Sequence, residues 1–374
     1  MKILLAGGKS GGHFYPLIAV AEAINKIAKE ENLLDAKLYF MSDSEYDAEA
    51  LVENDITFIK IQTGKLRRYF SFLNIIDLFR TGIGLVSAFL KVFRLYPDVV
   101  FSKGSGASFP VLFAARLLRI PVIIHESDSV PGRANKWAGK FAYRIAVSYP
   151  EAEKYFPTGK VALTGNPVRT EMLVPLTTSA HDYLKLETNV PTILILGGSL
   201  GSETINNHLL DALPLLVDKY QIVHQVGKQN VEAISNLTKV ILTNNPYQNR
   251  YRLYDYLNNL NMRMAAGASD LIISRAGSTI FEIASWGVPA IIIPISDSNG
   301  DHQRQNAYAY ARSGAAVVIE ENNLTSHLLV AEINRLFENK DQLEKMKRSA
   351  NLFFKADAAE KIARELIKVS LSHE

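Results

Sequence analysis

The feature that most constrains this chain is an apolar run that ends in a glycine-rich turn and occurs twice. Ile3–Ala6 runs into Gly7-Gly8, and Ile193–Leu196 runs into Gly197-Gly198. Each copy is followed by a helix pattern and then by alternating strand and helix signals. Such alternation indicates parallel sheets with helices on both faces. The repeat predicts an α/β protein with two Rossmann-like, doubly wound parallel-sheet domains that face a central cleft.

Further apolar runs predict the other strands. They are Lys37–Ser42, Val99–Ser102, Val122–His125 and Ile145–Val147 in the first half, and Gln221–Gln225, Leu271–Ser274 and Ala290–Ile295 in the second. Proline and polar residues cluster between Asn166 and Pro191, which indicates the linker. We expect an N-terminal domain over 1–166, a C-terminal domain over 167–350 and, within 351–374, a last helix from about Asn351 to Ser370 that packs back towards the N-terminal domain.

Composition excludes several classes of protein. A net charge of +3 over 374 residues is too small to predict a nucleic-acid partner, and the absence of cysteine excludes disulfides and thiolate chemistry. The histidines and acidic residues lack metal-site spacing, so we expect no metal and no cofactor. No apolar run reaches the roughly 18 residues of a membrane-spanning helix, and no signal peptide is recognisable, so we expect a cytoplasmic protein.

The stretch 271–307 carries the most chemical information. An apolar run ends at Ser274-Arg275-Ala276-Gly277, a short helix pattern follows until Gly287, and Glu282 lies in the first turn of that helix. A helix N-terminus attracts a phosphate, and a nearby carboxylate can accept from two sugar hydroxyls, so the unit suits a nucleotide. Thr279-x-x-Glu282 is alternatively a capping box, and the Ser278 and Thr279 hydroxyls could cap the helix or bind phosphate.

The first glycine turn fits neither common phosphate-loop pattern. Ile3 stands where a P-loop needs glycine, and Lys9 stands at the second glycine position of the dinucleotide fingerprint. Its glycines still allow close approach of a ligand. His13 follows at the start of the next helix, where it either serves the site or caps and packs the helix.

Polar side chains also follow other predicted strands. His125–Trp137 contains Asp128 and Asn135, which either line a site or form a hydrogen-bonded scaffold. Arg169 could reach a diphosphate or make an interdomain salt bridge. Ser199 could bind phosphate or cap a helix.

Residues 60–119 form a basic segment with a net charge of +8, from ten Lys and Arg against Asp77 and Asp98. Aromatic and aliphatic residues are interleaved with these cations. Such a pattern favours binding to an anionic membrane surface, although an ordinary core helix with a basic rim has the same pattern.

Taken together, these motifs resemble the MurG family, the UDP-N-acetylglucosamine:undecaprenyl-pyrophosphoryl-MurNAc-pentapeptide N-acetylglucosaminyltransferases of bacterial cell-wall synthesis. The similar segments run in the family's order: Gly7–Pro16, His125–Trp137, Gly165–Arg169, Gly197–Gly201, His224–Lys228, Arg275–Glu282 and Asp301–Ala307. The resemblance implies a GT-B fold and metal-independent, inverting transfer of GlcNAc from UDP-GlcNAc to the 4-hydroxyl of MurNAc in lipid I, which forms lipid II. It implies that the N-terminal domain binds lipid I and faces the membrane, and that the C-terminal domain binds UDP-GlcNAc. It also implies a peripheral location on the inner face of the cell membrane, with cell-wall synthesis or division proteins as further partners.

The resemblance also implies roles for individual residues. His13 would be the catalytic base, and Lys9, His13 and Asn135 would bind the acceptor. The implied donor-binding residues are Ser10, Gly11, Gly12, Asp128, Arg169, Ser199, Ser278, Thr279, Glu282 and Gln303.

Three departures from the family pattern affect fine specificity more than the reaction class. Lys9 adds a residue to the first loop, Asp128 replaces an asparagine, and the segment Arg275–Glu282 is one residue shorter than usual. Two rival functions share the predicted donor half: a GT-B transferase that uses another lipid acceptor, and a non-catalytic UDP-sugar-binding membrane scaffold. An NAD-dependent enzyme is a weaker rival, because the dinucleotide fingerprint fails in both halves.

Overall fold

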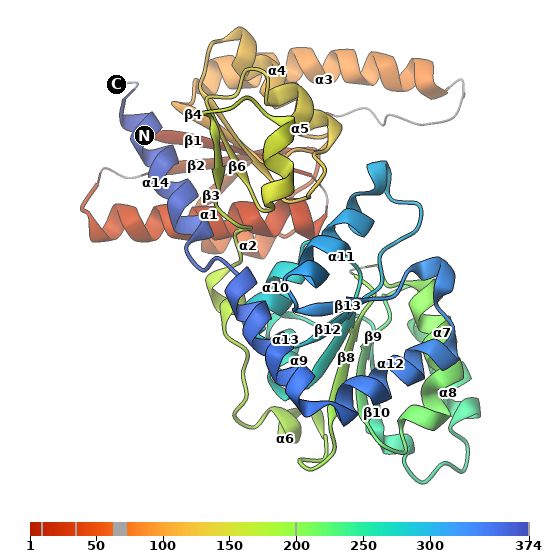
Figure 1. Cartoon of the computed structure of the whole chain (residues 1–374). Coiled ribbons are helices and arrows are strands. Elements are labelled where there is room, and N and C mark those ends of the chain that lie inside the picture. The colour runs from red at the N-terminus through yellow and green to blue at the C-terminus, as the bar shows by residue number, and fades with distance from the viewer. Residues whose placement is uncertain (9, 34–35, 63–72, 199, 373–374) are drawn as a thin grey trace. The chain divides into compact units, whose positions relative to one another are not determined.

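The computed structural model describes residues 1–8, 10–33, 36–62, 73–198 and 200–372, without the side chains of 73–81 and 299. The chain forms two compact units (Figure 1). Unit 1 contains Met1–Thr170 and Lys355–Glu374, and unit 2 contains Glu171–Phe354. The chain therefore leaves unit 1 inside the segment predicted as the linker and returns to it near the C-terminus. The substrate predicted for each domain stays a prediction.

Unit 1 is built on a parallel sheet of seven described strands in the order β3-β2-β1-β4-β5-β6-β7. Every neighbouring pair is parallel. The strands are β1 (Lys2–Ala6), β2 (Lys37–Ser42), β3 (Ile56–Lys60), β4 (Val99–Ser102), β5 (Val122–Glu126), β6 (Arg144–Val147) and β7 (Val161–Leu163).

Helices cover both faces of this sheet because alternate residues of its buried strands point to opposite sides. Ile3 and Leu5 of β1 pack in a core with α1 (Gly11–Glu30) and α14 (Ala358–Leu371), whereas Leu4 and Ala6 pack in a second core with α3 (Leu73–Leu95) and α4 (Phe109–Leu117). The helices are α1 (Gly11–Glu30), α2 (Ala48–Glu53), α3 (Leu73–Leu95), α4 (Phe109–Leu117), α5 (Arg133–Ala138) and α14 (Ala358–Leu371). The C-terminal helix α14 thus lies against α1, far from it in sequence (Figure 1).

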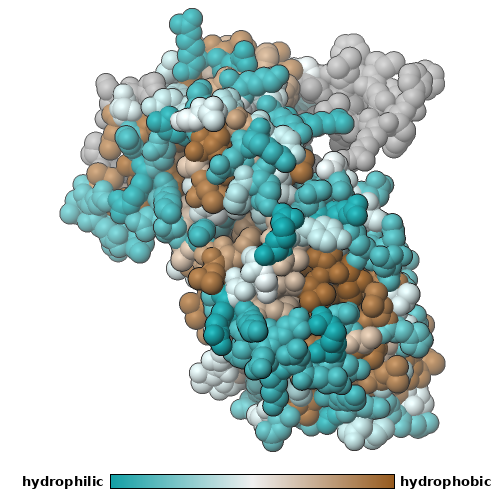
Figure 2. Space-filling model, in the orientation of Figure 1, coloured by the Kyte–Doolittle hydropathy of each residue, from teal (hydrophilic) through white to brown (hydrophobic). Residues whose placement is uncertain are grey.

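Unit 2 repeats the architecture with six described strands in the order β10-β9-β8-β11-β12-β13, again all parallel. The strands are β8 (Thr192–Leu196), β9 (Gln221–Gln225), β10 (Tyr251–Tyr254), β11 (Leu271–Ser274), β12 (Ala290–Ile292) and β13 (Ala316–Val318). The helices are α6 (Ala180–Leu184), α7 (Glu203–Leu216), α8 (Val231–Ile241), α9 (Asn259–Ala268), α10 (Thr279–Trp286), α11 (His302–Arg312), α12 (Ser326–Glu338) and α13 (Lys340–Phe353). Hydrophilic side chains cover much of the face drawn in Figure 2, as expected when the apolar residues fill cores of this kind.

Two doubly wound parallel sheets confirm the predicted fold class, whereas two predicted elements differ from the structure by more than one residue. Strand β12 ends at Ile292 and not at Ile295, because Pro294 has no N–H to donate to a ladder. The last predicted helix is broken: Asn351 belongs to α13, and α14 begins only at Ala358. The four strands that were not predicted, β3, β7, β10 and β13, are the edge strands of the two sheets.

Glycine is required where two loops of unit 2 cross. Gly201 has φ +79°, and a Cβ there would lie 1.8 Å from the Val226 carbonyl oxygen. Gly227 has φ +91°, and its Cβ would lie 2.2 Å from the Leu200 carbonyl oxygen. The loops after β8 and β9 therefore pack backbone against backbone, with no room for side chains.

We predict that Gly201→Ala destabilises unit 2 much more than Gly300→Ala does. Gly300 also has a positive φ, +66°, but a Cβ there would meet open space. The backbone conformation alone costs about 1–2 kcal/mol, and the collision adds about 1–3 kcal/mol at Gly201 only. Denaturant unfolding of both variants measures the difference, and equal losses would contradict the account.

Candidate functional site

The central strands of unit 2 bring two predicted loops together. β8 and β11 are neighbours, and Leu196 pairs with Ser274, so the loops that start at Gly197 and Arg275 leave the sheet side by side. The strand order reverses here, since the chain passes from β8 to β9 on one side and reaches β11 on the other. Ligands of doubly wound sheets bind at such a switch point, beyond the carboxyl ends of the strands.

Open space lies in front of both loops. A Cβ on Gly198 or on Gly277 would meet no atom within 4 Å. The N-cap of helix α10, Ser278, follows Gly277, so the N-terminal N–H groups and partial positive charge of the helix lie at this edge of the sheet. The arrangement suits an anion such as a diphosphate. Ser199, predicted to contact the donor, lies outside the described residues.

The structure places Glu282 in the first turn of α10 but does not support the capping box. The N-cap is Ser278, in a helical conformation (φ −61°, ψ −20°) and without a side-chain capping hydrogen bond. Thr279 is therefore the first helical residue and Glu282 the fourth, whereas the box needs the glutamate at the third. Glu282 is half-buried, as are Ser278 and Thr279. Gly287 ends the helix with φ +66°, which confirms that prediction.

Gln303 lies in the first turn of α11, after the loop that follows β12. Its side-chain oxygen accepts from the Ile295 N–H at 3.2 Å, and its own N–H donates to Ser298 Oγ at 3.3 Å. These bonds fix the loop around Gln303.

An ion pair that sequence reasoning missed joins four segments of unit 2. Arg275 is 9% exposed, and its Nη2 donates to Glu321 Oε1 at 2.5 Å and to Ser202 Oγ at 2.6 Å. Glu321 also accepts from the N–H and hydroxyl of Ser296, at 2.9 and 2.8 Å. Ser202 is the N-cap of α7, accepting from the Ile205 N–H. Arg275 thus ties the loops after β8, β11 and β12 to the turn that contains Glu321.

Hydrogen bonding decides the charge of Glu321. Burial alone would raise its pKa, but the bonds from Ser296 and Arg275 outweigh burial and lower the pKa to about 2. Glu321 is therefore ionised throughout the physiological pH range. Only the position of Arg275 directly after a predicted strand hinted at this role.

In unit 1 the corresponding switch point lies between β1 and β4, where Ala6 pairs with Ser102. The loop after β1 contains Gly7 and Gly8 and leads into α1, whose first residues are Gly11 and Gly12. Lys9 lies outside the described residues. Ser10 is the N-cap of α1, and its hydroxyl lies 2.8 Å from His13 Nδ1. His13 is half-buried in the first turn of α1, so its predicted position at the start of the helix is confirmed, while its catalytic role stays a prediction.

Glu126 organises the next loop. Its carboxylate accepts from the N–H of Asp128 at 2.9 Å, the N–H of Gly132 at 3.1 Å and Asn135 Nδ2 at 2.9 Å. Burial, followed by the charge of Asp128, raises the pKa of Glu126 to about 7. Asn135 is 2% exposed and also donates to the His125 carbonyl at 3.0 Å, so the hydrogen-bonded scaffold is present. The ligand-binding roles of Asp128 and Asn135 stay predictions.

Two cations lie close to this loop and to α1. Lys103, counted at the sequence level within the basic segment, is only 2% exposed, so it is not a surface cation. Its Nζ lies 2.8 Å from His125 Nδ1. Arg169 is 6% exposed, and its guanidinium carbon lies 3.8 Å from the centroid of the Tyr15 ring on α1. Arg169 therefore stacks on α1 within unit 1. Its partner Tyr15 is two residues after His13 in that helix.

The described residues contain no group of three or more His, Asp or Glu side chains that could hold a metal ion.

Comparisons with known proteins agree with this geometry. Residues 3–147 match the glycosyltransferase family 28 N-terminal domain, and residues 192–362 match the family 28 C-terminal domain. A Bacillus thuringiensis UDP-N-acetylglucosamine--N-acetylmuramyl-(pentapeptide) pyrophosphoryl-undecaprenol N-acetylglucosamine transferase is 38% identical over 91% of this chain and 92% of its own length. A relative of the same name from Clostridium botulinum is 35% identical over 98% of both chains.

Solved structures agree as well. The crystal structure of Acinetobacter baumannii MurG covers 98% of this chain and 99% of its own, with 27% identity and a TM-score of 0.71. The UDP-GlcNAc 2-epimerase of Neisseria meningitidis, bound to UDP-GlcNAc, has a TM-score of 0.69 at 17% identity, with 98% of this chain and 100% of its own covered, a likeness of fold alone. Fold and comparisons define a family 28 glycosyltransferase of the GT-B type. Within that class, the chain belongs to the MurG family.

We predict that Glu321→Gln destabilises the protein at neutral pH far more than Glu320→Gln. A carboxyl whose pKa falls from 4.5 to about 2 on folding contributes about 3 kcal/mol above pH 4.5. Glu320 pairs with Arg304, which is 52% exposed, and such surface pairs contribute only about 0–1 kcal/mol.

The sign of the pH dependence follows from the lowered pKa. The contribution of Glu321 is complete above about pH 4.5 and is lost as the pH falls towards 2. Denaturant unfolding as a function of pH should therefore show the gap between wild type and Glu321→Gln closing over that range. A gap that stayed constant there would contradict this assignment.

Proposed function

We propose that this chain transfers GlcNAc from UDP-GlcNAc to the 4-hydroxyl of the MurNAc residue of lipid I, which forms lipid II. The observation that carries the proposal is the family match over both units. The switch point of unit 2, with open space before Gly198 and Gly277 and the N-terminus of α10 beside it, supports it physically. The transfer assay at the end of the Discussion tests it.

The donor would be bound through its diphosphate and its ribose. The N-terminus of α10, with Ser278 and Thr279, and the loop at Gly197–Gly201 would bind the diphosphate. The Glu282 carboxylate would accept from the ribose hydroxyls, and Gln303 would complete the donor site. The other proposed donor contacts are Ser10, Gly11, Gly12, Asp128, Arg169 and Ser199.

The reaction would be a single displacement with inversion. The acceptor hydroxyl attacks the anomeric carbon, its proton goes to a base, and UDP leaves with the electrons of the broken bond. The guanidinium of Arg169 and the helix N-terminus would stabilise the charge that develops on UDP. A neutral imidazole can accept a proton, so His13 is our candidate for the base.

In this proposal the contact between Ser10 and His13 selects the ring nitrogen that acts as the base. If Nδ1–H donates to Ser10 Oγ across their 2.8 Å contact, the Nε2 lone pair can accept the proton from the acceptor. The opposite tautomer would place the hydrogen on Nε2 and prevent it from acting as a base. Ser10 therefore orients the base in this proposal.

We expect His13→Ala to lower kcat by about 10²–10⁴-fold, the usual contribution of a general base, while UDP still binds. Steady-state kinetics and calorimetric titration with UDP measure the two effects. His208→Ala, on α7 in unit 2, is the control and should leave kcat within about twofold. Near-normal turnover in His13→Ala would remove His13 from this role.

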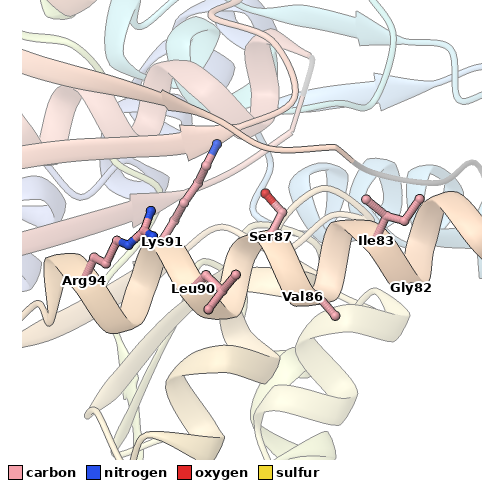
Figure 3. Close-up of a pocket in the computed structure, with 7 residues that line it drawn as sticks. All are labelled: Gly82, Ile83, Val86, Ser87, Leu90, Lys91 and Arg94. Atoms are coloured by element: carbon pink, nitrogen blue, oxygen red, sulfur yellow. The ribbon is translucent and has the colours of Figure 1, made fainter.

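Helix α3 supports a peripheral location at the membrane. Ile83, Val86, Leu90 and Phe93 form a stripe at helical spacing and are 58%, 61%, 46% and 56% exposed. Ile83, Val86 and Leu90 line a hollow along α3, together with two cations at the C-terminal end of the helix, Lys91 and Arg94 (Figure 3).

We propose that this stripe enters the headgroup region of an anionic membrane, as amphipathic basic helices do. Within the described residues, no helix combines the length and apolar character needed to cross a bilayer. The cations Lys65, Arg67 and Arg68 lie outside the described residues.

We predict that Ile83→Asp/Val86→Asp lowers binding to phosphatidylglycerol vesicles at least about tenfold, since it removes apolar area and adds negative charge. Transfer to a short-chain, soluble acceptor should be unchanged. Leu237→Asp/Val240→Asp, an exposed apolar pair on α8 of unit 2, is the matched control and should bind vesicles like wild type. Equal losses in both double variants would contradict a role for α3.

A further inference from the structure

Lys103 is a buried cation that the transfer chemistry above does not use. It follows β4 directly and is 2% exposed. Removing an ammonium group from water costs several kcal/mol unless partners replace the water. Burial lowers the pKa of Lys103 to about 8, against the opposing effect of Glu126 and Asp128, so at neutral pH most of the charge is retained. A charged ammonium group at this depth must therefore be held by hydrogen-bond partners.

Three contacts tie Lys103 to separate parts of unit 1. Its Nζ lies 2.8 Å from His125 Nδ1 and donates to Asn166 Oδ1 at 3.1 Å. Its backbone N–H donates to the Ala6 carbonyl at 3.1 Å. Lys103 therefore joins the end of β1, the end of β5 and the turn that follows β7.

His125 extends this anchor to Gly165, the residue before Asn166 in the turn. Burial and the charge of Lys103 hold the pKa of His125 well below its usual range, so the ring is neutral. With the ammonium group at Nδ1, the ring hydrogen lies on Nε2 and donates to the Gly165 carbonyl at 3.0 Å. Thr164 Oγ1 donates to the same carbonyl at 2.9 Å.

The anchored turn leads to Arg169. Gly165 has φ +82°, and a Cβ there would lie 2.6 Å from Lys355 Cβ, so this close approach of the turn to Lys355 requires glycine. Four residues later, Arg169 lies over the Tyr15 ring. The Tyr15 hydroxyl donates to Asp47 Oδ2 at 3.2 Å, which fixes the ring that carries the guanidinium.

We propose that Lys103 is a positioning residue for the transfer reaction, which anchors the Thr164–Arg169 turn and thereby holds the Arg169 guanidinium beside the first turn of α1. The inference rests on the proposed function, because Arg169 is the proposed diphosphate contact. Lys103 is too deeply buried to touch the substrate itself. Its effect on transfer should therefore depend on Arg169.

A double-mutant cycle on the full-length chain tests this. Lys103→Met should lower kcat/KM for UDP-GlcNAc by about 10- to 100-fold and weaken UDP binding, as loss of a charged hydrogen-bond anchor predicts. In an Arg169→Ala background the same change should cost less than about threefold, because the residue being positioned is gone. Lys103→Arg, which keeps the charge and the donors, should recover most of the loss.

Lys160→Met is the matched control. Lys160 is a half-buried lysine of the same unit, and its Nζ donates to the Ala142 carbonyl at 3.0 Å. Ala142 lies before the first residue of β6, away from the carboxyl ends of the strands where Lys103 lies. It should leave kcat/KM within about twofold in either background. Thermal unfolding of every variant separates lost stability from lost positioning. If Lys103→Met does not fold, Asn166→Ala removes one partner of the same anchor and replaces it in the cycle.

Either of two results would overturn the inference: kcat/KM of Lys103→Met within twofold of wild type, or losses from Lys103 and Arg169 that multiply independently. A fall in melting temperature with unchanged kcat/KM would mean that Lys103 only stabilises the fold. If wild type binds UDP but transfers no GlcNAc, the proposed function fails instead. The dissociation constant of UDP is then compared across the same four proteins of the cycle. Effects of Lys103→Met and Arg169→Ala on that constant that multiply independently would still overturn the positioning role.

Discussion

The reversal of strand order in the middle of each sheet is the constraint on which both candidate sites depend. The connection after β8 leads to one side of its sheet and the connection after β11 leads to the other, and β1 and β4 are related in the same way. The carboxyl ends of these strands are therefore not covered by the helices that follow them. Glycines follow β1 and β8, and Gly104 and Gly277 lie shortly after β4 and β11. The fold thus produces two similar edges, and the residues placed there make them chemically different.

Buried polar side chains hold these loops in place. In unit 2 the ion pair of Arg275 and Glu321 ties loops from three strands together. In unit 1 Lys103 and Glu126 have the corresponding role, although they do not pair directly with each other. Removing one partner of a buried, hydrogen-bonded charge is strongly destabilising, so each network holds its loop in one arrangement. Such rigid loops suit a reaction that depends on accurate positioning of two substrates.

The sequence predicted what local patterns encode. Central strands appear as continuous apolar runs, and Gly287 ends α10 where glycine was expected. The edge strands β3, β7, β10 and β13 were missed because each pairs on one side only and most of their residues stay partly exposed. Contacts between distant residues were also missed. Arg275 and Glu321 are 46 positions apart, and the burial of Lys103 depends on segments that only the folded sheet brings together.

The assignment of α10 shows how a local pattern can mislead. Thr279 and Glu282 have the spacing of a capping box, yet the helix begins one residue earlier because Ser278 already has helical dihedral angles. Spacing alone cannot decide between two adjacent hydroxyl residues as the cap. Glu282 is half-buried at the fourth helical position, one residue beyond the position that the box needs.

The most direct test of the account is transfer of radiolabelled GlcNAc from UDP-GlcNAc to a short-chain lipid I analogue, in the presence of EDTA. We predict a labelled lipid II analogue, which would establish donor, acceptor and metal independence together. UDP-GlcNAc binding without product would contradict the transferase assignment. Transfer to a diacylglycerol but not to lipid I would contradict the acceptor.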